Sequence, residues 1–188
     1  MLAVCVPVRD TVHSEFAYCL TQLVAALTRN NIEHQLFFEN GSMIADQRQR
    51  LVNVALERNA KQILWLDSDM TFPANVYTKL NSHNVSVVAC TYSTRTQPYR
   101  NVAVNLIDNY ADAIGMGCML TSVNVYYDVP QPWFNMMWDP ETKTFSGEDV
   151  YFCIELQKNG YTIVVDTELS KQVTHIGSVN IKLGNINV

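Results

Sequence analysis

The chain has 188 residues, of which 48% are hydrophobic, so it is long enough for one well-buried core and short for two. Its formal net charge is -5 and its thirteen Lys and Arg residues are scattered, which argues against a nucleic-acid-binding groove. The sequence has no secretion-signal pattern and no apolar run of the roughly 20 residues that span a bilayer. We therefore expect a soluble cytoplasmic protein without a membrane span, whose five isolated cysteines are reduced core residues.

Apolar runs and helical periodicity alternate through the first hundred residues. The apolar runs predict strands at 2–8, 34–39, 62–67 and 85–91. Helical spacing predicts helices at 15–30, with Ser14 as the candidate cap, at 43–59 and at 73–82. This order predicts an α/β fold with a mainly parallel central sheet. Ligands of such sheets lie beyond the carboxyl ends of the strands, here the segments "PVRD", "ENGS", "DSDM" and "TYSTR".

The regularity decays from about residue 92 to residue 147, where Tyr, Asn, Pro and Trp are frequent. The later pattern predicts a strand at 117–122, a helix at 148–159, a strand at 161–166 and a loop-like tail at 177–188. No repeat or interdomain linker interrupts the sequence, so we expect residues 1–188 to form one domain.

Two aspartates, Asp67 and Asp69, follow the third predicted strand directly. If the extended backbone continues, both side chains leave on the same face of the chain. Two carboxylates so close repel each other unless a proton or a cation intervenes, and Mg²⁺ or Mn²⁺ prefers such oxygen ligands. Alternatively, one aspartate caps the helix near Pro73 while the other is solvated.

Arg48 interrupts the apolar stripe of the helix predicted at 43–59, whereas Arg50 points away from it. The stripe consists of Ile44, Leu51, Val52 and Ala55. A guanidinium remains charged and is costly to bury without an anion. We expect Arg48 to bind a carboxylate such as that of Asp67 in a structural ion pair, or to bind a phosphate directly.

Asp149 belongs to the segment "FSGEDVYFCIEL" and shares a helix face with Phe152, Cys153 and Leu156. A carboxylate held inward at the first turn of a helix suits a general base. The alternative is that Glu148 and Asp149 only cap the helix.

His175, in "VTHIGS", could present a ring nitrogen to a metal, although a lone histidine is more often structural.

The order of these segments resembles that of the small GT-A glycosyltransferases, especially the family-2-like enzymes of bacteriophages and large viruses. The resemblance covers nearly the whole chain and rests on "VPVR", "GSMIADQRQRLV", "ILWLDSDMTFP", "TYSTR", "GMGCMLTS", "PWF", "SGEDVYFCIELQKNGY" and "THIGS". It implies the GT-A fold, a Rossmann-like three-layer sandwich around a mainly parallel sheet. It also implies a nucleotide-binding half at 1–91 and an acceptor and catalytic half at 92–188, in the host cytoplasm if the protein is viral.

The resemblance assigns roles to particular residues. Asp69 would bind the metal, His175 would complete its coordination, and Asp67 would meet the ribose or the metal shell. Asp149 matches the base of inverting members. Arg48 matches the arginine of a segment in which Gln49 here replaces the usual asparagine. The donor site would further include Pro7, Val8 and Arg9 at the nucleobase side, Glu39 after the second strand, and Ser68 between the two aspartates.

The resemblance implies a transferase that uses Mn²⁺ or Mg²⁺ to move a sugar from a nucleotide diphosphate donor to a hydroxyl of a glycan or another acceptor. Among the enzymes that the chain resembles, UDP is the usual nucleotide of the donor. A single base with an in-line displacement favours inversion at the anomeric carbon. Two alternatives stay open. A sugar-phosphate nucleotidyltransferase of related fold would need a glycine-rich loop after the first strand, and "PVRDTVHSE" contains no glycine. A non-catalytic nucleotide-sugar-binding module would bind a donor without turnover.

Overall fold

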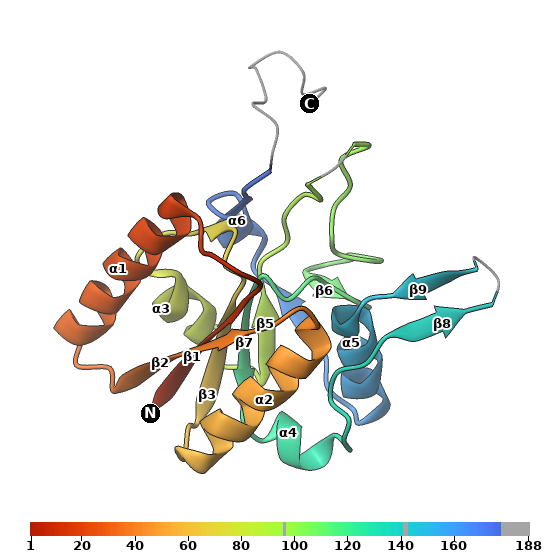
Figure 1. Ribbon diagram of the computed structural model, residues 1–188, viewed down its shortest axis with the longest axis horizontal. Coiled ribbons are helices and arrows are strands. Elements are labelled where there is room, and N and C mark those ends of the chain that lie inside the picture. Colours follow the sequence, from red (N-terminus) through yellow and green to blue (C-terminus); the bar gives the residue numbers. More distant parts are fainter. Residues whose placement is uncertain (96, 141–142, 178–188) are drawn as a thin grey trace.

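A seven-stranded sheet forms the centre of the protein, in the strand order β2-β1-β3-β7-β5-β10-β6 (Figure 1). The computed structural model describes residues 1–95, 97–140 and 143–177. The strands of this sheet are β1 (Leu2–Val8), β2 (His34–Asn40), β3 (Gln62–Leu66), β5 (Val87–Ala89), β6 (Tyr110–Ala111), β7 (Cys118–Ser122) and β10 (Ile163–Val165). Two small antiparallel pairs accompany them: β4 (Met70–Thr71) with β11 (Thr174–His175), and β8 (Met137–Asp139) with β9 (Thr144–Ser146).

Helices cover both faces of the sheet, so the protein has three layers. The helices are α1 (Ser14–Arg29), α2 (Ile44–Glu57), α3 (Val76–Asn81), α4 (Val125–Asp128), α5 (Glu148–Lys158) and α6 (Thr167–Ser170). The buried residues of α1, α3 and α6 form one core with the sheet, and those of α2, α4 and α5 form the other. Among the residues that the structure describes, no helix is both long and apolar enough to cross a membrane.

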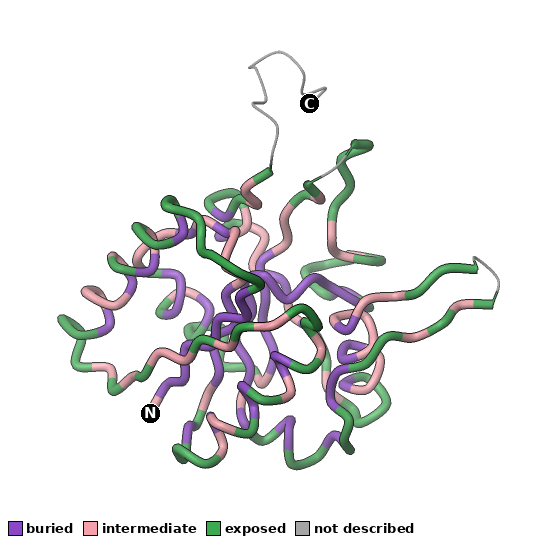
Figure 2. Tube along the Cα trace, in the orientation of Figure 1, coloured by how far each residue is buried: buried purple, intermediate pink, exposed green. Residues whose placement is uncertain are grey.

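Strands β1 and β3 supply both cores at once because successive side chains point to opposite faces. Ala3 and Cys5 face the core under α2, whereas Val4 and Val6 face the core under α1. A strand covered on both faces is apolar without interruption, which is why these segments appear as apolar runs in the sequence. Figure 2 shows the buried residues concentrated in these central strands and on the inner sides of the helices.

The sheet is mainly parallel, as expected, but it also contains antiparallel strands. Strands β1, β2 and β3 pair in parallel, and β5 pairs in parallel with β10. The fourth predicted strand, β5, does not pair with β3, because β7 inserts between them and runs antiparallel to both. Met119 of β7 lies opposite Trp65 and Ala89. Local patterning predicts that β7 is a strand, but not which neighbours it will have.

Several local expectations are corrected by the structure. Ser14 is the first residue of α1 rather than its cap, because His13 occupies the N-cap position and makes no side-chain capping bond. The helix predicted from Pro73 begins only at Val76, after a turn in which the amide of Val76 donates to the carbonyl of Pro73 at 3.0 Å. Ile44, expected in the buried stripe of α2, is exposed. The five cysteines are free, as expected. Of the predicted loop-like tail, residues 178–188 lie outside the described residues.

Candidate active site

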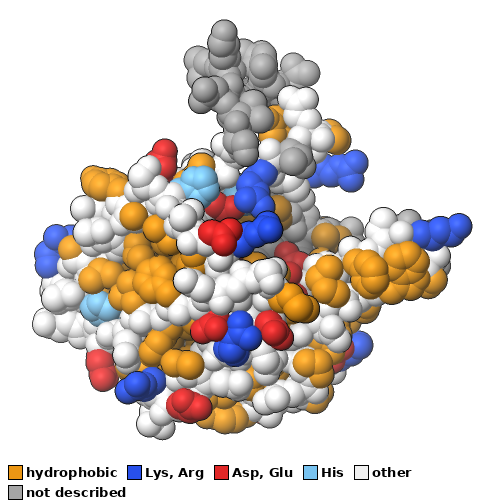
Figure 3. Space-filling view, viewed as in Figure 1, with side chains coloured by type: hydrophobic (Ala, Val, Ile, Leu, Met, Phe, Trp, Pro, Cys, Tyr) orange, Lys and Arg blue, Asp and Glu red, His pale blue; other side chains and the backbone are white. Residues whose placement is uncertain are grey.

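A cleft of about 690 Å³ opens where β1, β2, β3 and β5 end. All four segments singled out at the strand ends contribute to its wall, through Pro7 and Arg9, Gly41 and Ser42, Asp67 to Asp69, and Tyr92, Thr94 and Arg95. Residues from the far end of the chain, Asp149 and His175 among them, complete the lining. Figure 3 shows acidic and basic side chains gathered near the centre of this face. The rule that ligand sites form beyond the carboxyl ends of parallel strands therefore locates the cleft correctly.

Most of the residues predicted for the site line this cleft. They are Pro7, Arg9, Arg48, Asp67, Ser68, Asp69, Asp149 and His175. Val8 and Glu39 are not among the lining residues. The side chain of Val8 is buried in the core under α1, because side chains alternate along β1. The carboxylate of Glu39 instead accepts a hydrogen bond from Nε of Arg50 at 2.6 Å, on the outer side of α2.

Arg48 is buried, with 1% of its side chain exposed, and it joins two acidic residues that are far apart in the sequence. Its Nη2 donates to Oδ1 of Asp67 at 2.8 Å, and its Nε donates to Oε1 of Glu148 at 3.1 Å. The guanidinium lies 5.4 Å from the ring centre of Trp65. Burial alone would lower the pKa of Arg48, but the charges of Asp67 and Glu148 raise it above its usual value. The expectation of a buried arginine bound to Asp67 is confirmed.

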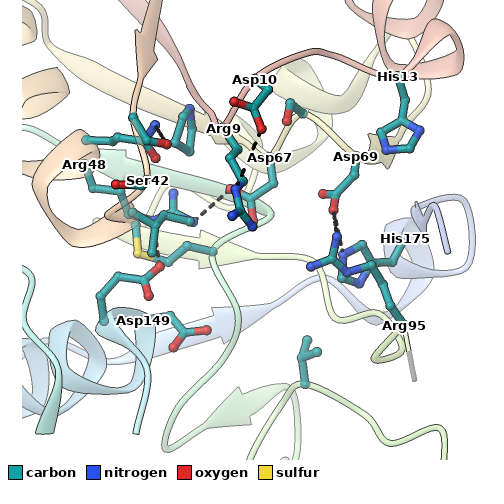
Figure 4. A pocket seen from close by; sticks show the side chains of 18 of the residues that line it. Arg9, Asp10, His13, Ser42, Arg48, Asp67, Asp69, Arg95, Asp149 and His175 are labelled. Atoms are coloured by element: carbon teal, nitrogen blue, oxygen red, sulfur yellow. Dashed lines mark hydrogen bonds and ion pairs between the residues drawn. The ribbon is translucent and has the colours of Figure 1, made fainter. Parts of the chain in front are cut away.

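Asp67 and Asp69 do not share a face, contrary to expectation. The extended backbone ends at Leu66, and a turn follows in which the amide of Met70 donates to the carbonyl of Asp67. Asp67 consequently faces Arg48, whereas Asp69 faces Arg95 and His175. In Figure 4 Asp67 lies between Arg48 on one side and the group formed by Asp69, Arg95 and His175 on the other. The aspartates are close in sequence but have different partners.

The pairing of β4 with β11 brings His175 to Asp69, across more than half the chain. Met70 and His175 lie opposite each other, and the amide of Ile176 donates to the carbonyl of Asp69 at 2.7 Å. Nε2 of His175 lies 3.3 Å from Oδ2 of Asp69, and Nη1 of Arg95 lies 2.6 Å from the same oxygen. Burial would raise the pKa of Asp69, but the hydrogen bond with His175 and the charges of His175 and Arg95 lower it below its usual value.

The other nitrogen of His175, Nδ1, lies 3.1 Å from the carbonyl oxygen of Ser93. A carbonyl oxygen only accepts hydrogen bonds, so Nδ1 carries the proton. In that tautomer the lone pair of the neutral ring is on Nε2, 3.3 Å from Oδ2 of Asp69, so Nε2 is the ring nitrogen that could bind a metal ion. The ring also contacts Tyr92 edge to face, with 5.3 Å between ring centres. The orientation of His175 is therefore determined by its surroundings.

Asp149 lies at the start of α5, after the N-cap Gly147. Its Oδ1 accepts a hydrogen bond from the amide of Val150 at 2.8 Å, and the side chain lines the cleft. A Cβ atom at Gly147 would come within 2.5 Å of Oδ1 of Asp149, so the glycine leaves room for the carboxylate. Burial, followed by the charge of Glu148, raises the pKa of Asp149 above its usual value.

Comparisons with known proteins were made for sequence and for structure. No protein family model and no curated relative matches the sequence. A197 from STIV has a similar structure, with a TM-score of 0.58 at 14% identity over 97% of this chain and 97% of its own. A mutant of the Drosophila β-1,4-galactosyltransferase 7, in complex with manganese, UDP-Gal and xylobiose, has a TM-score of 0.55 at 15% identity, over 94% of this chain and 71% of its own.

A third similar structure is a glycosyltransferase involved in the glycosylation of the major capsid of PBCV-1, with a TM-score of 0.51 at 14% identity over 93% of this chain and 92% of its own. This chain has a glycosyltransferase fold. The GT-A architecture expected from the sequence is thereby confirmed, and viral proteins are among its structural neighbours. At identities of 14% and 15% the likeness shows the fold alone.

Three residues that position side chains at the cleft were not identified from the sequence. Glu148 was expected at most to cap α5, but it is buried and binds Arg48. The amide of Gln47 is within hydrogen-bond distance of the carbonyls of Val8, Glu39 and Gly41, and so holds the ends of β1 and β2 together. Arg95 binds Asp69. For Arg95 a signal existed, because it lies in the strand-end segment "TYSTR".

Proposed function

We propose that the protein is a metal-dependent glycosyltransferase that moves a sugar from a nucleotide diphosphate donor, UDP being favoured, to a hydroxyl acceptor with inversion at the anomeric carbon. One observation carries the proposal. Asp69 and His175, from distant parts of the chain, meet at one wall of the cleft, and Asp149 lines the same cleft. The neighbouring galactosyltransferase complex, which contains manganese and UDP-Gal, gives independent support at the level of the fold.

The ligand atoms of Asp69 and His175 fit a divalent cation. Two ligand atoms that lie about 2.1 Å from one cation, at right angles to each other, are about 3 Å apart. The observed separation of Oδ2 and Nε2 is 3.3 Å. No group of three or more metal-binding side chains occurs within residues 1–95, 97–140 and 143–177. We propose that Asp69 and His175 hold Mn²⁺ or Mg²⁺, and that water and the donor diphosphate provide the remaining oxygen ligands.

Asp67 has a different part in this proposal, because one of its oxygens is already bound to Arg48. We assign it to the ribose or to a metal-bound water. Arg48 then acts by holding Asp67 and Glu148 in place. Pro7, Arg9 and Ser68, in the wall near the end of β1 and β3, are proposed to contact the nucleoside. Val8 and Glu39 act only through the backbone, whose carbonyls Gln47 binds.

The reaction follows from where charge develops. As the bond between the anomeric carbon and the diphosphate breaks, negative charge grows on the leaving oxygen, and a bound cation would stabilise it. Asp149 accepts the proton of the acceptor hydroxyl while that oxygen attacks from the opposite face of the sugar, which inverts the anomeric carbon. The raised pKa of Asp149 makes it a stronger base than an ordinary carboxylate. Residues 1–91 would bind the donor, and residues 92–188 the glycan or other acceptor.

Two alternatives remain weaker. A nucleotidyltransferase of related fold would bind phosphates with a glycine-rich loop after β1, and the residues that follow β1 contain no glycine before Gly41. A non-catalytic module would keep its affinity for the donor but would not need the inward-facing base at Asp149. The expected location in the cytoplasm belongs to the proposal as well.

We expect one nucleotide sugar to raise the melting temperature well above the others, and only in the presence of Mn²⁺ or Mg²⁺. Ligand at 100 times its Kd stabilises the folded protein by about 2.7 kcal/mol. Thermal unfolding with a panel of nucleotide sugars, with and without chelator, measures this effect. Asp69→Asn should abolish the metal-dependent part, whereas Asp46→Asn, on the exposed side of α2, should retain it. Equal behaviour of all donors, or indifference to chelator, would contradict the proposed function.

A further inference from the structure

The carboxylate of Asp69 already has a cationic partner, the exposed side chain of Arg95. Nη1 of Arg95 lies 2.6 Å from Oδ2 of Asp69, the oxygen that Nε2 of His175 also approaches. Figure 4 shows Arg95 and His175 reaching Asp69 from the same wall of the cleft. This oxygen is the one that a cation between Asp69 and His175 would need. Arg95 therefore occupies part of the proposed metal position.

A guanidinium and a divalent cation at this position would repel each other, so one must leave when the other binds. Arg95 can leave easily, because 55% of its side chain is exposed and Asp69 is the acceptor it binds in the described part of the cleft. Arg48 offers the contrast. It is 1% exposed and is held between two carboxylates. Arg95 and Arg48 thus differ in how freely they can move.

Once released from Asp69, Arg95 would still line the cleft where a diphosphate binds. A guanidinium donates two parallel hydrogen bonds to phosphate oxygens, and charge-assisted bonds of this kind are among the strongest in proteins. The diphosphate would therefore replace Asp69 as the anion that Arg95 binds once the metal occupies Asp69. Metal alone does not allow this exchange, because it displaces Arg95 from Asp69 without providing another anion for the guanidinium.

We propose that Arg95 is an exchangeable latch on the metal site. It binds Asp69 while the cleft holds no donor, and it turns onto the diphosphate when metal and nucleotide bind together. This inference rests on the proposed function and adds a regulatory step to it. Because each ligand favours the same displaced state of Arg95, their binding must be cooperative, and the coupling must be the same whichever ligand binds first.

The variant Arg95→Gln tests the latch in binding experiments that need no turnover. Binding of Mn²⁺ alone is measured by the electron paramagnetic resonance signal of the free ion, and binding of UDP, with and without Mn²⁺, by calorimetry. Loss of an exposed ion pair should make Mn²⁺ alone bind about three- to fivefold more tightly. Loss of a charge-assisted phosphate contact should weaken UDP in the presence of Mn²⁺ by about tenfold or more.

Two further variants sharpen the result. Arg95→Lys keeps a positive charge beside Asp69 but cannot form the bidentate contact with a phosphate. The variant should therefore bind Mn²⁺ like the wild type and bind UDP with Mn²⁺ more weakly. Arg100→Gln, an exposed arginine of the same loop that does not line the cleft, should change neither affinity. Thermal unfolding verifies that each variant is folded.

The outcomes separate this inference from the proposed function. Opposite changes in the two affinities of Arg95→Gln support the latch. Wild-type affinities in that variant, or weaker binding of Mn²⁺ alone, overturn the latch and leave the donor site intact. If the wild-type protein binds neither Mn²⁺ nor any nucleotide, the proposed function fails and the latch fails with it.

Discussion

Asp149→Asn should lower the turnover of sugar transfer about 10²- to 10⁴-fold, the usual contribution of a general base. The substitution keeps the size of the side chain and the acceptor oxygen for the amide of Val150, but the amide group cannot take up a proton. Asp69 and His175 are untouched, so binding of Mn²⁺ and donor should persist. Steady-state rates together with donor binding by calorimetry measure both. Unchanged turnover would remove Asp149 from the mechanism, and no turnover in either form would favour the non-catalytic module.

The same variant should not be less stable than the wild type, which distinguishes a functional carboxylate from a structural one. Burial and the charge of Glu148 raise the pKa of Asp149, so the folded protein disfavours its ionised form. At neutral pH the ionised side chain therefore reduces the free energy of unfolding, and replacement by Asn should leave that free energy equal or higher. The activity of the wild type should fall as the pH is lowered through the raised pKa of Asp149.

Arg48→Ala should lower the free energy of unfolding by about 3–5 kcal/mol, because it leaves two partly buried carboxylates without their cation. The chain offers a matched control on the same helix. Arg50 also binds two acidic residues, Glu39 and Asp46, but 47% of its side chain is exposed. For such a pair water compensates most of the loss, so Arg50→Ala should cost about 1 kcal/mol or less.

Urea unfolding of the two arginine variants measures this difference directly. Adding Glu148→Gln to Arg48→Ala should restore part of the lost stability, since it removes one of the unpaired charges. Equal effects of the two single substitutions would mean that the buried network is not organised around Arg48. A larger effect of Arg50→Ala would contradict the burial that separates the two side chains.

Several parts of the site could be predicted because they depend on short stretches of sequence. The inward direction of Arg48 follows from the spacing of Leu51, Val52 and Ala55 on α2, which are all buried. The position of the cleft follows from the alternation of strands and helices, since parallel strands end at the same edge. The expectations of the GT-A fold and of a common site for His175 and Asp69 came from the resemblance of the motif order. No local sequence pattern indicates either of them.

Other parts could not be predicted because they depend on contacts between distant segments. The insertion of β7 between β3 and β5 depends on which apolar strand fills the centre of the sheet. The partner of Glu148 is an arginine on α2, and a charged residue at a helix start gives no sign of such a contact. The turn after Leu66 directs Asp67 and Asp69 to different partners, although an extended backbone would have directed them to the same face.

The amino-acid sequence by itself determined the α/β alternation, the buried strands and the helix faces, because these follow from the periodicities of 2 and 3.6 residues in the backbone. Only the tertiary structure decided by which contacts the charged groups are brought together. Asp69 meets His175 through the pairing of β4 with β11, and Arg48 meets Glu148 because α2 and α5 contribute to the same core on one face of the sheet. The reason is physical: charged side chains at strand and helix ends have no periodicity of their own, and their partners depend on long-range packing.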